Sequence, residues 1–189
     1  MNVWRRLAIV LSVLLLSGCL VTFPKALPPE QAAPANLLGK WASKDAWGEH
    51  LNLTISRVGP NRYHATSRAL ESAEVDRKKP KVSLDQVDFT VARHGSRWYA
   101  SATMPKEYGG RYALAGFELT EGGELVVYNL DVEQVKQALE QKALRGEVYE
   151  AQQNEGVLVE SPLEEVFAYL DDPANSDVFI EIARYQRAK

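Results

Sequence analysis

Few side chains in this chain of 189 residues have types suited to catalysis or metal binding. The chain has one cysteine, Cys19, and three histidines, which are His50, His64 and His94. No two of these histidines stand at the spacing of zinc ligands, and the sequence lacks the HExxH, CxxC and Gly-x-Ser-x-Gly patterns. We therefore predict that the protein is not an enzyme and that it uses no metal and no cofactor.

One polar cluster combines His50 with Asp45 and Glu49. Imidazole and carboxylate groups of this kind can bind a metal weakly. The alternative interpretation is a polar cluster at the edge of a strand.

A single basic run also stands out, and it has two interpretations. It is either a solvated loop or a contact for anionic lipid headgroups, because each cation near a membrane surface contributes ~1 kcal/mol. The basic residues of the run are Arg77, Lys78, Lys79 and Lys81.

Cys19 closes an apolar segment that follows two arginines, Arg5 and Arg6. The tetrad Leu16-Ser17-Gly18-Cys19 resembles the lipobox of bacterial lipoproteins, where the precursor is cut and the new N-terminal cysteine is lipidated. The resemblance implies a signal peptide over residues 1–18 and a diacylglyceryl thioether on Cys19, usually with an N-acyl chain such as palmitate. Two alternatives stay open. One is an uncleaved transmembrane anchor, whose helix needs ~17–25 apolar residues. The other is an ordinary signal peptide with an unrelated cysteine.

Lipidation at Cys19 would leave the mature protein without a thiol, so its own core must stabilise it without disulfides. Two or more acyl chains hold a protein firmly on a membrane. In Gram-negative lipoproteins an aspartate after the cysteine favours the inner membrane, and this chain has Leu20. The resemblance thus implies attachment to the cell outer membrane facing the periplasm, with the outer leaflet of the inner membrane as the alternative.

The chain has 22 basic against 25 acidic residues, a formal net charge of −3. A mildly acidic protein is not expected to bind nucleic acid, which needs a basic face. Residues 19–36 contain the cysteine and four prolines, which predicts a semi-rigid spacer that lifts the domain off the bilayer, with a proline-motif docking site as the alternative. Residues 37–189 are long enough for one globular domain.

Apolar and polar residues alternate through most of that domain, as in strands with one buried face. The pattern runs through residues 51–55, 87–91 and 98–104, and residues 112–119 and 125–130 add two further strands. Short turn sequences separate the strands, which predicts an antiparallel meander. These turn sequences are Gly59-Pro60-Asn61, His94-Gly95-Ser96, Gly109-Gly110 and Gly122-Gly123.

Two helices are expected after the meander. The first follows Asp131 as its N-cap and carries apolar residues at helical spacing from Val132 to Leu144, before Gly146. The second begins with Ser161-Pro162-Leu163-Glu164, a capping-box pattern with proline at the first helical position. Alternation over residues 178–183 then predicts a last strand that returns to the sheet.

The predicted fold is therefore α+β and mainly β, an antiparallel meander curled into a barrel or half-barrel with two helices near the C-terminus. Gly39-Lys40-Trp41 resembles the Gly-x-Trp start of lipocalin-like barrels, which implies a barrel with a ligand-binding interior. The aromatic residues expected to line that interior are Trp41, Phe89, Trp98 and Phe117. A buried core role is the alternative for these side chains.

These observations favour a lipid-anchored envelope protein whose β-rich domain binds an apolar small molecule, a lipid or a partner protein. The alternative is a scaffold or assembly subunit that docks through a sheet edge or a helix. The two hypotheses differ in whether the inside of the sheet is hollow or filled.

Overall fold

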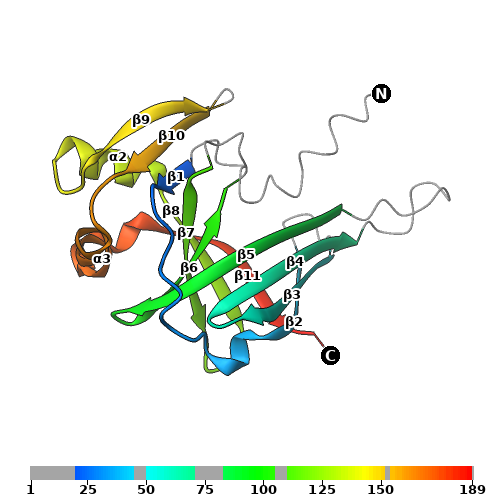
Figure 1. Cartoon of the computed structure of the whole chain (residues 1–189). Helices are drawn as coiled ribbons and strands as arrows, with labels where there is room; N and C mark the ends of the chain where they lie inside the picture. The colour runs from blue at the N-terminus through cyan, green and yellow to red at the C-terminus, as the bar shows by residue number, and fades with distance from the viewer. Residues whose placement is uncertain (1–19, 45–49, 71–82, 105–109, 152–153, 189) are drawn as a thin grey trace, which may run out of the picture.

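Eight antiparallel strands close into a barrel, and three further strands extend its sheet (Figure 1). The computed structural model describes residues 20–44, 50–70, 83–104, 110–151 and 154–188. The barrel strands are β2 (Gly39–Lys44), β3 (His50–Gly59), β4 (Arg62–Leu70), β5 (Ser83–His94), β6 (Arg97–Thr103), β7 (Tyr112–Leu119), β8 (Leu125–Leu130) and β11 (Phe179–Arg187). They pair in the order β6-β5-β4-β3-β2-β11-β8-β7, and β7 pairs with β6 to complete the circle. The predicted mainly β meander, curled into a barrel, is confirmed.

The two ends of the barrel differ. At one end lie the short turns β3–β4, β5–β6 and β7–β8, together with the segment that leads into β2; we call this the closed end. The turn residues Asn61, Gly95 and Gly123 have φ values of 51°, 56° and 79°, as tight hairpin turns require. The opposite end, where β2, β4 and β6 finish and β3, β5 and β7 begin, is the open end.

The additional strands branch from β7. They are β1 (Leu20–Phe23), β9 (Gly146–Ala151) and β10 (Asn154–Val159). The first residues of β7, Tyr112 and Ala113, pair with β1, whereas residues 116–119 pair with β8. β1 then pairs in parallel with β10, and β9 forms the outer edge. The sheet therefore forks at β7 into the barrel wall and a second layer.

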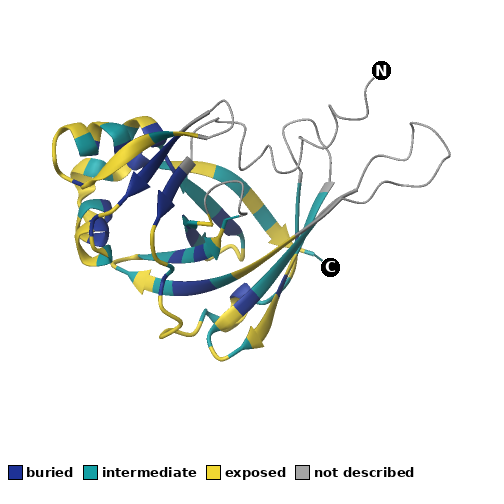
Figure 2. Ribbon diagram, turned by 45° about the horizontal axis from the view of Figure 1, so that its top comes forward, coloured by how far each residue is buried: buried dark blue, intermediate teal, exposed yellow. Residues whose placement is uncertain are grey.

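Helices α2 (Val132–Glu140) and α3 (Leu163–Asp171) belong to this second layer, with the short 3-10 segments η2 (Ala35–Leu37) and η4 (Pro173–Val178) at other connections. The structure accordingly has two hydrophobic cores. One lies inside the barrel and the other between the outer face of β6 and β7 and the second layer, where Figure 2 shows buried residues on α3, β1 and β10. The outer core includes Val21, Phe23, Tyr99, Leu114, Val135, Val157, Phe167 and Val178.

The segment that the sequence predicts as a spacer is packed against the domain. β1 begins at Leu20, and Val21, Thr22 and Phe23 are all buried. Leu27 is buried as well, and its carbonyl accepts a hydrogen bond of 2.7 Å from the Thr90 hydroxyl. The structure therefore differs from the predicted free spacer over residues 20–36, because distant strands supply the surface that covers its apolar side chains.

The two helices near the C-terminus are confirmed, but only one begins as predicted. The Asp131 side chain caps α2 by accepting hydrogen bonds from the backbone of Glu133 and Gln134. The predicted capping box at α3 is wrong. The Ser161 hydroxyl makes no cap hydrogen bond and instead accepts a hydrogen bond of 2.9 Å from the Arg145 backbone. The β9–β10 hairpin between the helices was not predicted.

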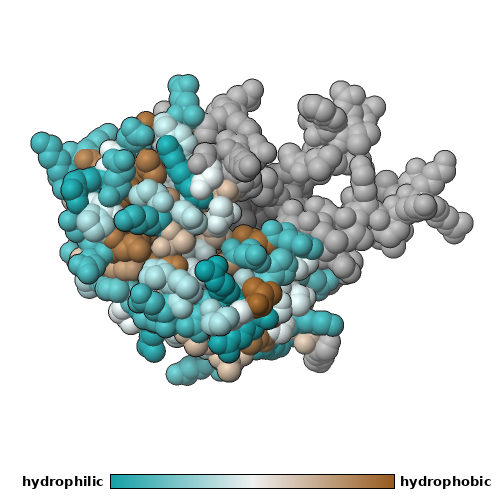
Figure 3. All heavy atoms as spheres, viewed as in Figure 1, coloured by the Kyte–Doolittle hydropathy of each residue, from teal (hydrophilic) through white to brown (hydrophobic). Residues whose placement is uncertain are grey.

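The face shown in Figure 3 is mainly hydrophilic, with scattered apolar residues. Within the described ranges, neither helix has the length and apolar character that a membrane crossing requires.

The packing of the N-terminal segment gives a direct test. Replacing the buried Phe23 by alanine should lower the free energy of unfolding by about 3–5 kcal/mol, because it removes a large side chain from the outer core. The exposed neighbour Lys25 is the control, and Lys25→Ala should change stability by less than about 0.5 kcal/mol. Urea unfolding of the two variants measures both values. Equal, small effects would indicate a spacer that does not contribute to the fold.

Candidate functional site

The interior of the barrel is filled at its closed end. The four aromatic residues predicted to line a ligand site, Trp41, Phe89, Trp98 and Phe117, all belong to the inner core. Trp41 and Phe117 are buried, and Phe89 and Trp98 pack against them as partly buried side chains. The predicted residues thus come together inside the barrel, where they form a floor rather than the walls of a cavity.

Ring contacts hold this aromatic floor together. The ring centroids of Tyr63 and Phe89 are 5.6 Å apart, and those of Trp98 and Phe117 are 6.1 Å apart. The Tyr63 hydroxyl accepts a hydrogen bond of 2.7 Å from the Ala33 backbone, and the Trp41 indole donates one of 2.9 Å to the Leu37 carbonyl. These bonds fix the segment before β2 beneath the closed end.

Above the floor, several inward positions of the wall are alanine. Strand register identifies them, because side chains two residues apart along a strand face the same side. Ala100 and Ala115 are opposite each other and follow the inward residues Trp98 and Phe117 along their strands. The same alternation points further small side chains inward toward the open end. These residues are Ala65, Ser67, Ala102, Ala113 and Ala183.

Solvent reaches this part of the interior. Ala100 is partly exposed, although its outward-facing neighbours Tyr99 and Ser101 are only 1% and 4% exposed. The exposed area of Ala100 therefore faces the inside of the barrel. Val87 and Ile180, whose register also points them inward, are 38% and 42% exposed. These three inward positions toward the open end are therefore not fully covered by inner packing, and the sequence analysis missed this although alanines at alternate positions were its signal.

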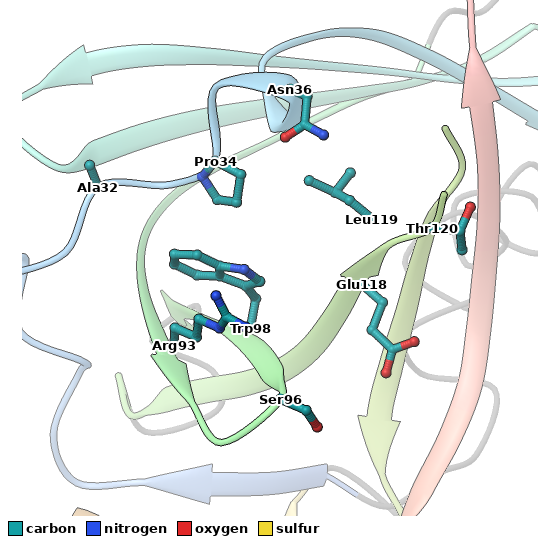
Figure 4. Close-up of a pocket in the computed structure, with 9 residues that line it drawn as sticks. All are labelled: Ala32, Pro34, Asn36, Arg93, Ser96, Trp98, Glu118, Leu119 and Thr120. Carbon is teal, nitrogen blue, oxygen red and sulfur yellow. The ribbon is translucent and has the colours of Figure 1, made fainter. Parts of the chain in front are cut away.

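A separate hollow of about 570 Å³ lies at the closed end (Figure 4). The segment before β2 contributes Ala32, Pro34 and Asn36, and the ends of β5, β6 and β7 contribute the rest. The partly exposed Trp98 lies between this hollow and the inner core. The closed end therefore has a concave outer surface of its own.

The described histidines do not meet in one site. His64 lies on the outer face of β4 with its Nδ1 2.5 Å from Asp88 Oδ1, and His94 pairs with Asp171 of α3. Asp88 and His94 are six residues apart on β5, which corresponds to about 20 Å. In the described part of the chain, no group of three metal-ligating side chains comes together. Asp45 and Glu49 lie outside the described residues, and so does the His50 side chain.

Tyr99 is a buried titratable group that shares the neighbour Phe167 with His94. Burial of the phenol raises the pKa of Tyr99 to about 12, and the Asp171 carboxylate adds to the rise while Arg97 opposes it. Tyr99 therefore remains protonated near neutral pH. Its ring packs against Phe167 at a centroid distance of 5.0 Å, as expected for a core residue.

Two predicted sites lie outside the described residues. They are the lipidation site Cys19 and the basic run of Arg77, Lys78, Lys79 and Lys81. The run belongs to the connection between β4 and β5.

The fold defines a mainly β protein with a closed eight-stranded antiparallel barrel, consistent with the lipocalin-like barrel that Gly39-Lys40-Trp41 suggests. The chain matches no protein-family model, no curated protein and no solved structure.

The small and incompletely buried inward side chains predict an unusual tolerance to larger side chains. Ala115→Leu should change the free energy of unfolding by less than about 0.5 kcal/mol, because the added carbons enter accessible space. Ala138 is the matched control, since it is buried in the outer core, and Ala138→Leu should cost about 1–3 kcal/mol through overpacking. Denaturant unfolding compares the two. A filled barrel would give similar losses for both variants.

Proposed function

We propose that this protein is a lipid-anchored lipoprotein of the cell envelope whose barrel holds an apolar small molecule or lipid in its open half. The observation that carries the proposal is the exposure of inward-facing Ala100 between two buried outward-facing neighbours. A binding interior needs such unfilled space above a rigid floor.

The chemistry of the open half favours an apolar ligand. The same register turns Leu51, Leu53, Ser67, Val87, Val127, Asn129 and Ile180 inward beside the alanines. Among the residues whose side chains are described, this half of the wall turns no charged group inward. Burial of each methylene contributes about 0.8 kcal/mol, so a chain of about eight methylenes would gain about 6 kcal/mol before the cost of ordering it.

Lipidation of Cys19 is the second part of the proposal. It rests on the lipobox resemblance of Leu16-Ser17-Gly18-Cys19, and with Leu20 after the cysteine it favours the outer membrane over the inner membrane. In this proposal Leu20, the first residue of β1, would directly follow the lipidated residue. β1 pairs with the first residues of β7, which lie in the open half of the barrel.

Because β1 packs against β7 and β10 directly after the cysteine, an anchor on Cys19 would hold the domain close to the bilayer instead of lifting it away. The basic run between Leu70 and Ser83 connects β4 and β5 at the open end of the barrel, which supports a contact of that end with anionic headgroups. An apolar ligand could then pass between membrane and barrel over a short path.

A scaffold remains the second candidate function, and one observation favours it. β9 is the outer strand of the extended sheet, with one edge that pairs with no described strand. Val148 on this strand is 49% exposed. An extended segment of a partner protein could add to this edge by strand pairing.

Mass spectrometry of the protein purified from its own membranes in mild detergent tests the proposal. We expect a denatured mass for a chain that begins at lipidated Cys19 and a native mass with one additional apolar molecule. The variant Ala115→Leu should keep the lipidated mass and lose the adduct, because the leucine occupies the open half.

Each outcome addresses a separate part of the proposal. A chain that keeps an unmodified Met1 would contradict the anchor. A lipidated chain with no native adduct would contradict the ligand and leave the scaffold.

A further inference from the structure

The hollow at the closed end has the features of a second binding site, separate from the open half. We infer that it binds a small molecule with a flat apolar ring and one negatively charged group, such as an aromatic carboxylate. This inference does not depend on the ligand proposed for the open half, because the aromatic floor separates the two spaces.

The walls of the hollow suit a flat ring. Trp98, Pro34 and Leu119 all line it, and Figure 4 shows the indole of Trp98 with the Pro34 ring and the Leu119 side chain around the same space. Phe117 stacks against Trp98 inside the barrel with an interplanar angle of 23°. The indole is thus held in place and presents an aromatic surface to a ligand.

Arg93 supplies the positive charge. Its guanidinium lies 6.0 Å from the Trp98 ring centroid, and it also lines the hollow. Among the described residues, no carboxylate lies within ion-pair distance of Arg93. A planar guanidinium group without a carboxylate partner is suited to bind a carboxylate ligand through two parallel N–H···O hydrogen bonds.

The acidic residue of the hollow does not neutralise this arginine. Glu118 Oε1 is 3.2 Å from Arg97 Nε, and Glu118 Oε2 accepts a hydrogen bond of 3.3 Å from the Tyr128 hydroxyl. In Figure 4 the Glu118 carboxylate points away from the indole. The charge that faces a ligand beside Trp98 is therefore that of Arg93.

The hollow is also preorganised. The Arg93 backbone donates a hydrogen bond of 2.6 Å to the Gln31 side chain, and the Ala33 backbone donates to the Tyr63 hydroxyl. These bonds tie the segment containing Ala32, Pro34 and Asn36 to the barrel at two points. A volume of about 570 Å³ is within the range of small-molecule sites.

The test uses two probes of the same shape, 2-naphthoate and its uncharged amide, 2-naphthamide. Nuclear magnetic resonance of the isotope-labelled protein follows the indole N–H of Trp98, assigned with Trp98→Phe. We expect a saturable shift with the acid and at least about tenfold weaker binding of the amide, because a charge-assisted hydrogen bond is lost. This comparison is made on the unaltered protein, so it does not depend on how a variant folds.

Two arginine variants then locate the charge. Arg93→Gln should remove the preference for the acid over the amide. Arg145→Gln should retain it, because Arg145 is an exposed arginine paired with Glu165 of α3 and does not line the hollow. Ala115→Leu should also leave binding unchanged, which separates this site from the proposed function.

Three results would overturn the inference. They are an indole signal that does not shift saturably, equal binding of acid and amide, and a preference for the acid that survives Arg93→Gln. Binding of naphthoate that Ala115→Leu abolishes would likewise assign the ligand to the open half.

Discussion

Arg187 joins the first and last strands of the barrel, β2 and β11, and closure of the barrel at this seam depends on its contacts. The ladder between β11 and β2 has two residue pairs, Gln186 with Ala42 and Arg187 with Trp41, and the Ala188 backbone donates a further hydrogen bond of 3.1 Å to the Lys40 carbonyl. The Arg187 guanidinium lies 4.1 Å from the Trp41 ring centroid and donates hydrogen bonds to the carbonyls of Asn36 and Leu38. A Cβ atom on Gly39, which has φ +120°, would lie 2.6 Å from that guanidinium. The glycine of the Gly-x-Trp sequence therefore makes room for the arginine that closes the barrel.

The consequence is a barrel with two unlike halves. At the closed end, Trp41, the aromatic floor and the segment before β2 form a rigid base with a hollow on its outer side. Toward the open end, β1, α2 and α3 cover the outside of β6 and β7 with a second core. These strands are therefore stabilised from the outside as well as by the inner core. The proposed ligand site thus depends on packing outside the barrel.

The sequence predicted the barrel wall well, because alternation with a period of two depends only on residues close in the chain. The strands around Leu53, Val91 and Trp98 follow from it. β1 could not be predicted in the same way, since the burial of Val21 and Phe23 depends on partners in β7 and β10 that lie about a hundred residues away. Ser161 has the sequence of a helix cap, yet its hydroxyl bonds the Arg145 backbone across the second layer. The aromatic candidates were located inside the barrel, but alternation alone does not show which end of an interior is filled.

The central claim is that the barrel is filled at one end and hollow at the other, and xenon reports this difference directly. Xenon enters apolar cavities and shifts the resonances of the methyl groups around it. Methyl spectra of the protein under xenon pressure should show concentration-dependent shifts at Ala100 and Ala115, with none at Val91 in the inner core or Ala138 in the outer core. Shifts absent from all four residues, or equal at all four, would contradict the account.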